Sequence, residues 1–459
     1  MASREHWGSR LGFIMAAAGS AVGLGNLWKF PYITYENRGG SFVLVYLACV
    51  ALVGLPIMIA EFVMGRRSER NLVGAFEVLR PGAPLWKVVG WMGVLNGFVI
   101  LSYYSVVAGW TLEYTLRSAV GFFEGMTGEE ISGSFVTFLA NPYKQVWWHG
   151  VFMALTLGVV IGGIHRGIER WTKILMPILA VLVVLLMGYS MAVGDSRRAL
   201  AFLFNFSSPI TAHGVLEALG HAFFTLSVGM GVMVTYGSYL SRDQDIGKVA
   251  FTVTLMDTVI ALAACLMLYP IIFAYDVPIA ESIGIIFTTL PFVFQQMPFG
   301  SVMAPLFFLL VAFAALSSTI SLLEVVVTYA VDEWGRRRQQ AAVVAAAVIF
   351  LFGVPSALCL GAWPWLSRLT LLSKGGTALG WFDSFDYLAT NWLLPLGGLA
   401  IAVFAGWSMT EADRESEFET GEDTRRVLDY RLWRFVIRYV SPVAVFVVLL
   451  YKVGVVGKG

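Results

Sequence analysis

Long apolar stretches alternate with short polar segments along almost the whole chain of 459 residues. A bilayer core of about 30 Å needs roughly 20 apolar residues per helix. With that length as the window, the pattern predicts an all-α membrane protein with eleven transmembrane helices, for which the solvent is lipid. The predicted spans lie near residues 11–34, 41–65, 87–118, 147–164, 170–193, 213–240, 247–275, 301–332, 340–361, 388–410 and 433–455.

Lys and Arg residues sort the connecting segments into two sides. The side that includes the N-terminus carries about 20 of them and the other side about 10. Because positively charged loops stay in the cytoplasm, the N-terminus is predicted to be cytoplasmic and the C-terminus to lie outside. The segments predicted to face the cytoplasm are 66–87, 165–173, 241–248, 333–339 and 411–432.

Three connecting segments carry further information. Residues 119–146 are polar and predict an external loop, whereas 411–432 is so highly charged that we expect a solvated cytoplasmic connector. The apolar segment from Ile283 to Phe294 is too short to cross a bilayer. It therefore predicts a re-entrant or lid segment.

A short glycine motif occurs twice, near the middle of the first and of the sixth predicted span. The copies are Val22-Gly23-Leu24-Gly25 and Val228-Gly229-Met230-Gly231. They are five spans apart and thus oppositely oriented, which is typical of an inverted repeat whose two broken helices meet at mid-membrane. Freed N–H groups there can hold a carboxylate, and freed carbonyls a cation. The alternative is that these glycines only allow close helix packing.

Asp257 stands in the middle of the seventh span. A carboxylate at that depth costs about 2.5–3.5 kcal/mol, so it needs a partner and indicates function. The alternative is a carboxylate that hydrogen bonds to neighbouring threonines. Glu61 and Glu324 lie nearer the cytoplasmic ends of their spans, and for them the sequence favours a structural role.

Several hydroxyl and amide side chains lie close to the glycine motifs or in the eighth span. Such neutral oxygens suit a hard cation, although serines in membrane helices also bond back to the carbonyl four residues earlier. These candidates are Asn26, Thr225, Ser227, Ser317 and Ser318.

Charge and motifs exclude other classes of protein. The formal net charge of +1 excludes a broadly basic nucleic-acid binder. The three cysteines lie in apolar runs. The sequence contains no zinc-binding motif, no phosphate-binding motif and no nucleophile–base motif, so we do not expect an enzyme. Membrane lipid is the expected partner, and the oligomeric state stays open.

The motifs resemble the neurotransmitter:sodium symporter family over nearly the whole chain. The resemblance is carried by Gly19-Ser-Ala-Val-Gly-Leu-Gly-Asn-Leu-Trp-Lys-Phe-Pro31, Glu61-Phe-Val-Met-Gly-Arg66 and Gly167-Ile-Glu-Arg170. It implies a LeuT-type 5+5 inverted repeat in a bacterial cytoplasmic (inner) membrane. Residues 1–193 would form the first repeat, 213–410 the inverted second repeat, 411–432 a charged cytoplasmic loop and 433–455 the eleventh helix.

The resemblance also implies two bound Na⁺ ions, held by oxygen atoms. The first would be held by the substrate carboxylate together with Ala21, Asn26, Thr225 and Asp257. The second would join the first span to the eighth and lock the outward-facing state, held by Gly19, Val22, Ala314, Ser317 and Ser318.

An amino-acid substrate is implied in the same way. Relatives that carry amines without a carboxylate have Asp where this chain has Gly23, so Gly23 favours an amino acid. The substrate carboxylate would meet Leu24, Gly25 and Tyr104. The ammonium would meet Ala21, Phe224, Thr225 and Ser227, and the side chain would lie among Ser20, Ile100, Phe224, Met230, Ser318 and Leu322.

The chain departs from its relatives at two positions. Many have Asn where this chain has Asp257, and balance the charge with chloride or with an acid where this chain has Ala261, so transport is expected to be chloride-independent. The outer gate would pair Lys29 with Asp386, and lysine lacks the two-pronged geometry of arginine. The inner gate would pair Arg4 with Asp332 beside Trp7 and Tyr239. Gly167 and Pro177 would form a hinge in the fifth span.

These inferences converge on Na⁺-coupled symport of a hydrophobic or aromatic amino acid into the cell, with tryptophan as the leading candidate. The alternative is an amino-acid sensor of the same fold that does not transport.

Overall fold

The structure is a computed structural model that describes residues 5–276, 284–374, 377–421 and 428–455. Each of the eleven predicted ranges overlaps helical structure. Short π-helical stretches within these helices are labelled η. In chain order these are α1–η1–α2 (Arg10–Ala21, Gly25–Lys29, Phe30–Glu36), α3–η2–α4 (Gly40–Cys49, Val50–Gly54, Leu55–Ser68), α6 (Leu85–Ala119), α8 (Pro142–Val160), η3–α9 (Ile164–Glu169, Arg170–Val193), α11–α12 (Ala212–Thr225, Val232–Gly237), α13 (Ile246–Ala274), α15 (Gly300–Trp334), α16 (Arg338–Cys359), α18–η4–α19–η5 (Trp381–Tyr387, Leu388–Leu393, Leu394–Val403, Phe404–Ser408) and α21–η6–α22 (Tyr430–Phe435, Val436–Val440, Ser441–Lys452).

Length and composition single out fewer spans than the sequence predicts. In the described part of the chain, eight helices are long and apolar enough to cross a membrane, or nine if α1 and the bent η1–α2 segment count as one. The number eleven therefore stays a prediction, while the helical membrane fold itself is confirmed.

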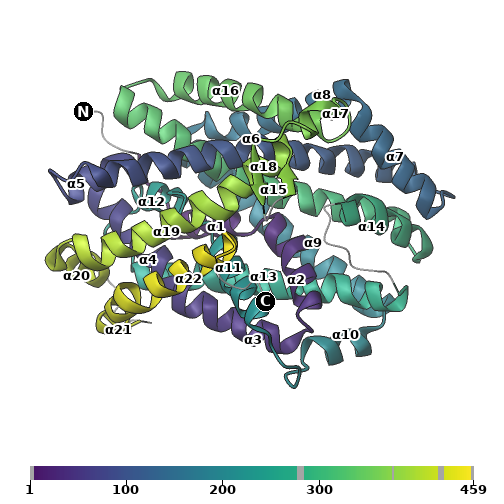
Figure 1. Ribbon diagram of the computed structural model, residues 1–459, viewed down its shortest axis with the longest axis horizontal. Helices are drawn as coiled ribbons and strands as arrows, with labels where there is room; N and C mark the ends of the chain where they lie inside the picture. Colours follow the sequence, from purple (N-terminus) through teal and green to yellow (C-terminus); the bar gives the residue numbers. More distant parts are fainter. Residues whose placement is uncertain (1–4, 277–283, 375–376, 422–427, 456–459) are drawn as a thin grey trace.

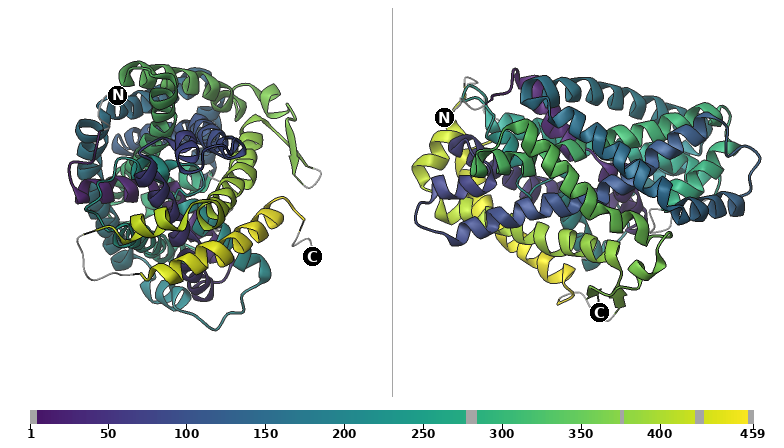
Figure 2. Two further views of the ribbon diagram at one scale, coloured as in Figure 1. Left: turned by 90° about the vertical axis from the view of Figure 1, so that its left-hand side faces the viewer. Right: turned by 90° about the horizontal axis from the view of Figure 1, so that it is seen from above.

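Several connecting segments gather at the two ends of the molecule. In Figure 1, α5 (Leu72–Leu79), α20 (Glu411–Glu419) and α21 lie at one end, and α7 (Gly128–Ala140) and α14 (Gly284–Gln296) at the other. Which end faces the cytoplasm stays a prediction. The two further views show α16 and α22 at the periphery (Figure 2), whereas most residues of α1 are buried. The remaining short elements are α10 (Ser196–Leu203), α17 (Pro364–Ser367), β1 (Leu372–Lys374) and its antiparallel partner β2 (Thr377–Leu379).

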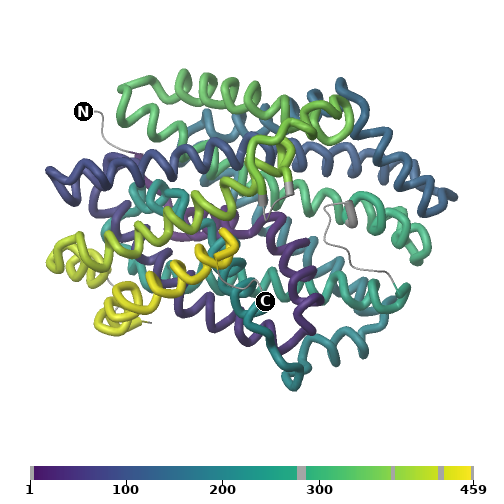
Figure 3. Tube along the Cα trace, viewed as in Figure 1, coloured from purple at the N-terminus to yellow at the C-terminus, as the bar shows by residue number. Residues whose placement is uncertain are grey.

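The first glycine motif interrupts the first span. Helix α1 ends at Ala21, Val22 is extended with φ −72° and ψ 110°, and the chain resumes as η1 at Gly25. The two parts are bent by 53°, a change of direction near the centre of the molecule that can be followed in the tube of Figure 3.

The second glycine motif interrupts the sixth span between α11 and α12. Ser227, Gly229 and Gly231 have φ values of 53°, 88° and 79°. This left-handed region is open to glycine but cannot continue a right-handed helix. Glu61 of α4 stabilises the break, because its fully buried carboxylate accepts the Gly229 N–H at 2.6 Å and the Val234 N–H at 3.3 Å. The structural role favoured for Glu61 agrees with this.

A third irregularity separates α8 from η3. Gly163 has φ 81°, and the Ile164 N–H donates to the Glu5 carboxylate at 2.8 Å. The predicted hinge residues lie here and in the next helix. Gly167 packs so closely that a Cβ would lie 2.2 Å from the Val159 carbonyl oxygen, and Pro177 lies inside α9.

The charged segment 411–432 differs from the expected solvated connector. Its first part is helix α20, in which Arg414, Glu417 and Phe418 are buried. Glu417 forms an ion pair with the buried Arg66 of α4 at 2.8 Å. The expectation of full solvation was wrong for 411–419 because the three residues are spaced i, i+3 and i+4. They therefore share one helix face, a pattern that composition alone conceals.

The other two connecting segments also contain helices. Within 119–146, α7 buries Ile131, Phe135 and Phe138. The predicted lid corresponds to α14, whose Phe287 stacks on Phe135 at 5.6 Å between ring centroids. Ile283, where the predicted lid begins, lies outside the described residues.

Candidate functional site

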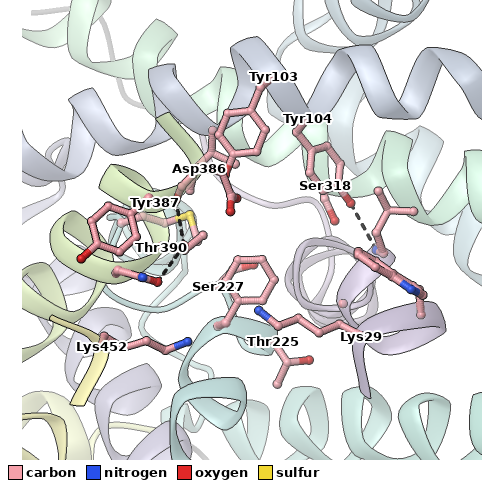
Figure 4. A pocket seen from close by; sticks show the side chains of 18 of the residues that line it. Lys29, Tyr103, Tyr104, Thr225, Ser227, Ser318, Asp386, Tyr387, Thr390 and Lys452 are labelled. Atoms are coloured by element: carbon pink, nitrogen blue, oxygen red, sulfur yellow. Dashed lines mark hydrogen bonds between the residues drawn. The ribbon is translucent and has the colours of Figure 1, made fainter. Parts of the chain in front are cut away.

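The two broken spans, together with α6, α15, α18 and α22, enclose a cavity of about 760 Å³ (Figure 4). All residues predicted to bind the substrate line it. They are Ser20, Ala21, Gly23, Leu24, Gly25, Ile100, Tyr104, Phe224, Thr225, Ser227, Met230, Ser318 and Leu322. The breaks thus bring residues about 200 positions apart onto one surface, which is what the repeated glycine motif predicts.

Backbone groups of the first break face this cavity. The Leu24 N–H donates to the Tyr104 hydroxyl at 3.2 Å (Figure 4). A Cβ on Gly23 would lie 2.8 Å from Ser318 Oγ and 3.2 Å from the Tyr104 hydroxyl. Any side chain at position 23 would therefore occupy space that the glycine leaves to a ligand.

Three of the residues predicted for the first sodium ion form one buried cluster. Asn26 Nδ2 donates to Asp257 Oδ1 at 2.7 Å, and Thr225 Oγ1 donates to the same oxygen at 3.0 Å. Asp257 is fully buried, and its two donors come from the two broken spans rather than from its own helix α13. Ala21, the fourth predicted residue, lies at the end of α1 and lines the cavity.

The residues predicted for the second sodium ion lie where α1 ends against α15. Ser318 Oγ lies 3.5 Å from the Val22 carbonyl oxygen and 3.3 Å from the Ala314 carbonyl oxygen. Ser317 Oγ donates to the Ala314 carbonyl at 2.9 Å. A Cβ on Gly19 would lie 3.1 Å from Ser317 Cβ, so all five predicted residues are neighbours.

The chemistry of both clusters fits a hard monovalent cation. Their polar atoms are carbonyl, hydroxyl and amide oxygens with one carboxylate, which are ligands for hard cations and not for soft transition metals. Among the described residues no group of three or more His, Cys, Asp or Glu side chains could hold a metal ion. The cysteines Cys49, Cys265 and Cys359 are free.

The outer end of the cavity is not closed by the predicted gate. Lys29 and Asp386 both line the cavity (Figure 4), but no ion pair joins them in the part of the chain that the structure describes. Instead the Lys29 ammonium lies 5.1 Å from the centroid of the Phe224 ring.

The opposite end is filled by packed side chains. Trp7 is 8% exposed, its indole N–H donates to the Tyr236 carbonyl at 3.0 Å, and its backbone N–H donates to the Tyr239 carbonyl at 3.2 Å. The Tyr239 hydroxyl donates to Glu324 at 2.9 Å. Asp332 accepts the Asn71 N–H at 2.7 Å, while Arg4 lies outside the described residues.

Sequence reasoning missed several residues of the cavity. Ser321 accepts the Ser20 hydroxyl at 2.7 Å and follows Ser318 by three positions, so helical spacing could have revealed it. Asn391 and Lys452 also line the cavity. They lie in helices of the tenth and eleventh spans, where a single polar residue gives no periodic signal.

Comparison with known proteins agrees with this architecture. A sequence profile of the sodium:neurotransmitter symporter family matches residues 4–124 and 139–457. An uncharacterized sodium-dependent transporter of Bacillus subtilis (strain 168), YhdH, is 36% identical over 451 residues, which cover 98% of each chain. One from Haemophilus influenzae is 30% identical over 458 residues, which cover 97% of this chain and 98% of that one.

A solved structure extends the similarity to three dimensions. MhsT, a transporter with the LeuT-type fold, was solved in complex with L-phenylalanine. Its structure superposes on this chain with a TM-score of 0.87 at 42% sequence identity, and the match covers 98% of this chain and 100% of the MhsT chain. The chain is therefore an integral membrane protein that belongs to the sodium:neurotransmitter symporter family of secondary transporters.

Proposed function

We propose that the protein carries a hydrophobic or aromatic amino acid into the cell by Na⁺-coupled symport. The observation that carries this proposal is the buried cluster of Asp257, Asn26 and Thr225, which lies between the two broken spans beside the cavity. An ion held there would contact both broken helices and, through the substrate carboxylate, the substrate itself. Ion and substrate binding would then be directly coupled.

Each sodium ion has its own oxygen set in this proposal. The first is bound by the Ala21 carbonyl, the Asn26 and Thr225 side chains and the Asp257 carboxylate, and is completed by the substrate. The second is bound where Val22 and Gly19 of α1 meet Ala314, Ser317 and Ser318 of α15. It bridges a broken helix and a continuous one, and therefore holds the outward-facing state.

The substrate is held at both ends of its zwitterion. Its carboxylate accepts from the Gly25 N–H, from the Tyr104 hydroxyl and from the Leu24 N–H, which donates to that hydroxyl in this structure. The start of a helical segment favours an anion through its N–H donors and its positive dipole end. Its ammonium donates to carbonyls near Ala21, Phe224 and Thr225 and to the Ser227 hydroxyl.

The side chain of the substrate lies against a mostly apolar surface. Ile100, Phe224, Leu322 and the pliable Met230 favour an apolar or aromatic group, with Ser20 and Ser318 at its edge. MhsT, which shares 42% of its sequence with this chain, was crystallised with L-phenylalanine. Tryptophan is our leading candidate.

Charge balance makes transport chloride-independent in this proposal. Asp257 supplies a fixed negative charge next to the first sodium ion. Ala261, one helical turn further along α13, contributes none.

Alternating access completes the mechanism. The spans α1–α2, α3–α4, α11–α12 and α13 rock against α6, α8, α15 and α16, with the N-terminus in the cytoplasm and the C-terminus outside, in a bacterial cytoplasmic membrane. Gly167 and Pro177 form the hinge through which water reaches the second sodium site. Lys29 with Asp386, and Asp332 with Arg4 beside Trp7 and Tyr239, close the outer and inner ends in turn.

Uptake in proteoliposomes tests the proposal. Accumulation of radiolabelled tryptophan, phenylalanine or leucine should require an inward Na⁺ gradient and stop when K⁺ or choline replaces Na⁺. Uptake that is indifferent to this replacement would overturn Na⁺ coupling. Na⁺-dependent binding in thermal-shift assays without any accumulation would instead favour the sensor alternative.

A further inference from the structure

One buried carboxylate binds the N-terminal segment to the fifth predicted span. Glu169 is the last residue of η3, and its side chain is only 1% exposed. It accepts the Gly8 N–H at 2.7 Å and the Ser9 hydroxyl at 2.9 Å. The two donors precede Glu169 by 161 and 160 positions, so this one side chain joins two segments that are far apart in the sequence.

Two side chains of the same span set the orientation of this carboxylate. Lys173 Nζ donates to Glu169 Oε1, and His165 Nδ1 lies 3.1 Å from Glu169 Oε2. Both residues lie four positions from Glu169, which is about one helical turn. The carboxylate is therefore held in place by its own span while it accepts the two donors of the N-terminal segment.

Ser9 extends this contact to helix α1. Its hydroxyl is the N-cap of α1, because it accepts the Gly12 N–H at 3.0 Å while it donates to Glu169. A Cβ on Gly12 would collide with the Glu169 carboxylate, so a glycine at this position lets α1 begin close to η3. The first turn of α1 is thus fixed to η3, whereas the other end of α1 carries Gly19 and Val22 of the second proposed sodium site.

A second contact between the same two segments runs in the opposite direction. Here the N-terminal segment supplies the carboxylate, since Glu5 accepts the Ile164 N–H at the start of η3 at 2.8 Å. Between the two contacts, the indole N–H of Trp7 donates to the Tyr236 carbonyl of α12 at 3.0 Å. Residues 5–9 therefore bind η3 at both of its ends and α12 in between.

We propose that Glu169 is a positioning residue of the transport cycle, which keeps α1 against η3 until the end filled by Trp7 opens. The inference rests on the proposed alternating access. The hinge residue Gly167 lies two positions before Glu169, so a change in the winding of η3 moves the carboxylate away from both of its N-terminal donors. A sodium ion between α1 and α15 opposes this release, because it holds the opposite end of α1.

Cysteine labelling in detergent tests this role, because both ends of the molecule are then accessible to the reagent whichever one faces the cytoplasm. Ala17 of α1 is fully buried, and Ala17→Cys is made in a background without the three native cysteines. In Glu169→Gln an NH₂ group replaces one acceptor oxygen, so a maleimide in K⁺ should label position 17 roughly fivefold faster than in the parent. Na⁺ with phenylalanine should return the rate to within about twofold of the parent, because bound ligands shift the population toward the closed state.

Variants of Ser9 separate its bond to Glu169 from its role as a helix cap. Ser9→Ala removes the cap and one donor, whereas Ser9→Asp keeps an acceptor for the Gly12 N–H but places a second carboxylate against Glu169. Ser9→Asp should therefore be labelled faster than Ser9→Ala, and in the Glu169→Gln background it should be labelled no faster. Glu129→Gln, on the exposed first turn of α7, is the control and should leave the rate at position 17 unchanged.

Two results would overturn the inference while Na⁺-dependent uptake stays intact. One is an unchanged rate at position 17 in Glu169→Gln. The other is a rise that is equal with and without Na⁺ and phenylalanine, which would mean that Glu169 only maintains the fold. Uptake by the wild-type protein that is indifferent to Na⁺ would instead overturn the proposed function, and the inference with it.

Discussion

Asp257 links three helices through a single carboxylate. Its hydrogen bonds to Asn26 and Thr225 satisfy a charge that would otherwise be costly to bury. The sequence identified Asp257 because an acid in an apolar run is conspicuous, and it identified Asn26 and Thr225 because they flank glycine motifs. It could not identify Lys452 or Asn391, because they become residues of the cavity only through the way distant helices meet.

Asparagine at position 257 tests the charge argument. Asp257→Asn removes the negative charge beside the first proposed sodium site, so uptake in chloride-free gluconate buffer should fall roughly tenfold or more. Chloride should restore part of it if the anion can take over the charge. Asp276→Asn is the control, because Asp276 lies just beyond the same helix and its side chain is 85% exposed. Unchanged uptake of Asp257→Asn without chloride would refute the argument.

Helices α1 and α11 each end at a glycine motif, where backbone N–H and carbonyl groups are no longer bonded within a helix. The breaks could be predicted because the glycine motifs are visible in the sequence. Glycine in a helix interior costs about 1 kcal/mol relative to alanine, and a pair of such motifs at matching positions needs a cause. Helix α20 was missed because its charged composition concealed a buried face formed by Arg414, Glu417 and Phe418. The composition of a segment indicates only how polar it is on average, whereas the spacing of its residues indicates which side chains share one face of a helix.

Glu61 should be essential to the break between α11 and α12. Glu61→Gln replaces one of two acceptor oxygens by an NH₂ group, which cannot accept the backbone N–H that the lost oxygen held. We expect a loss of about 1–3 kcal/mol in stability, measured as a lower unfolding temperature in detergent. Glu77→Gln is the matched control, since the Glu77 side chain is 54% exposed. Equal unfolding temperatures for the two variants would contradict this role.

At the scale of the whole molecule, the two ends of the cavity differ. One end is filled by Trp7, Tyr239 and Glu324, whereas at the other end Lys29 and Asp386 form no ion pair within the described part of the chain. With the orientation that we propose, this asymmetry would be that of an outward-facing transporter. Sequence alone predicts the residues of both ends but not which end is closed, because both arrangements use the same side chains.

Cysteine labelling can follow the closure of the outer mouth. Asn391→Cys, in a background where Cys49, Cys265 and Cys359 are replaced by alanine, places a thiol in the cavity wall. With a membrane-impermeant maleimide, Na⁺ alone should raise the labelling rate, and Na⁺ with substrate should lower it about threefold or more. Thr137→Cys, on the exposed face of α7, should react at one rate throughout. A labelling rate at position 391 that also stays constant would argue against closure of this end of the cavity.

The order of the chain gives the Asp257 cluster a consequence for biosynthesis. Asn26 and Thr225, its two hydrogen-bond donors, are translated before Asp257 itself. When α13 enters the bilayer during synthesis, both neutral partners are already part of the nascent chain. The Asp257 carboxylate can therefore form hydrogen bonds with them as it is inserted, instead of remaining unpaired in lipid.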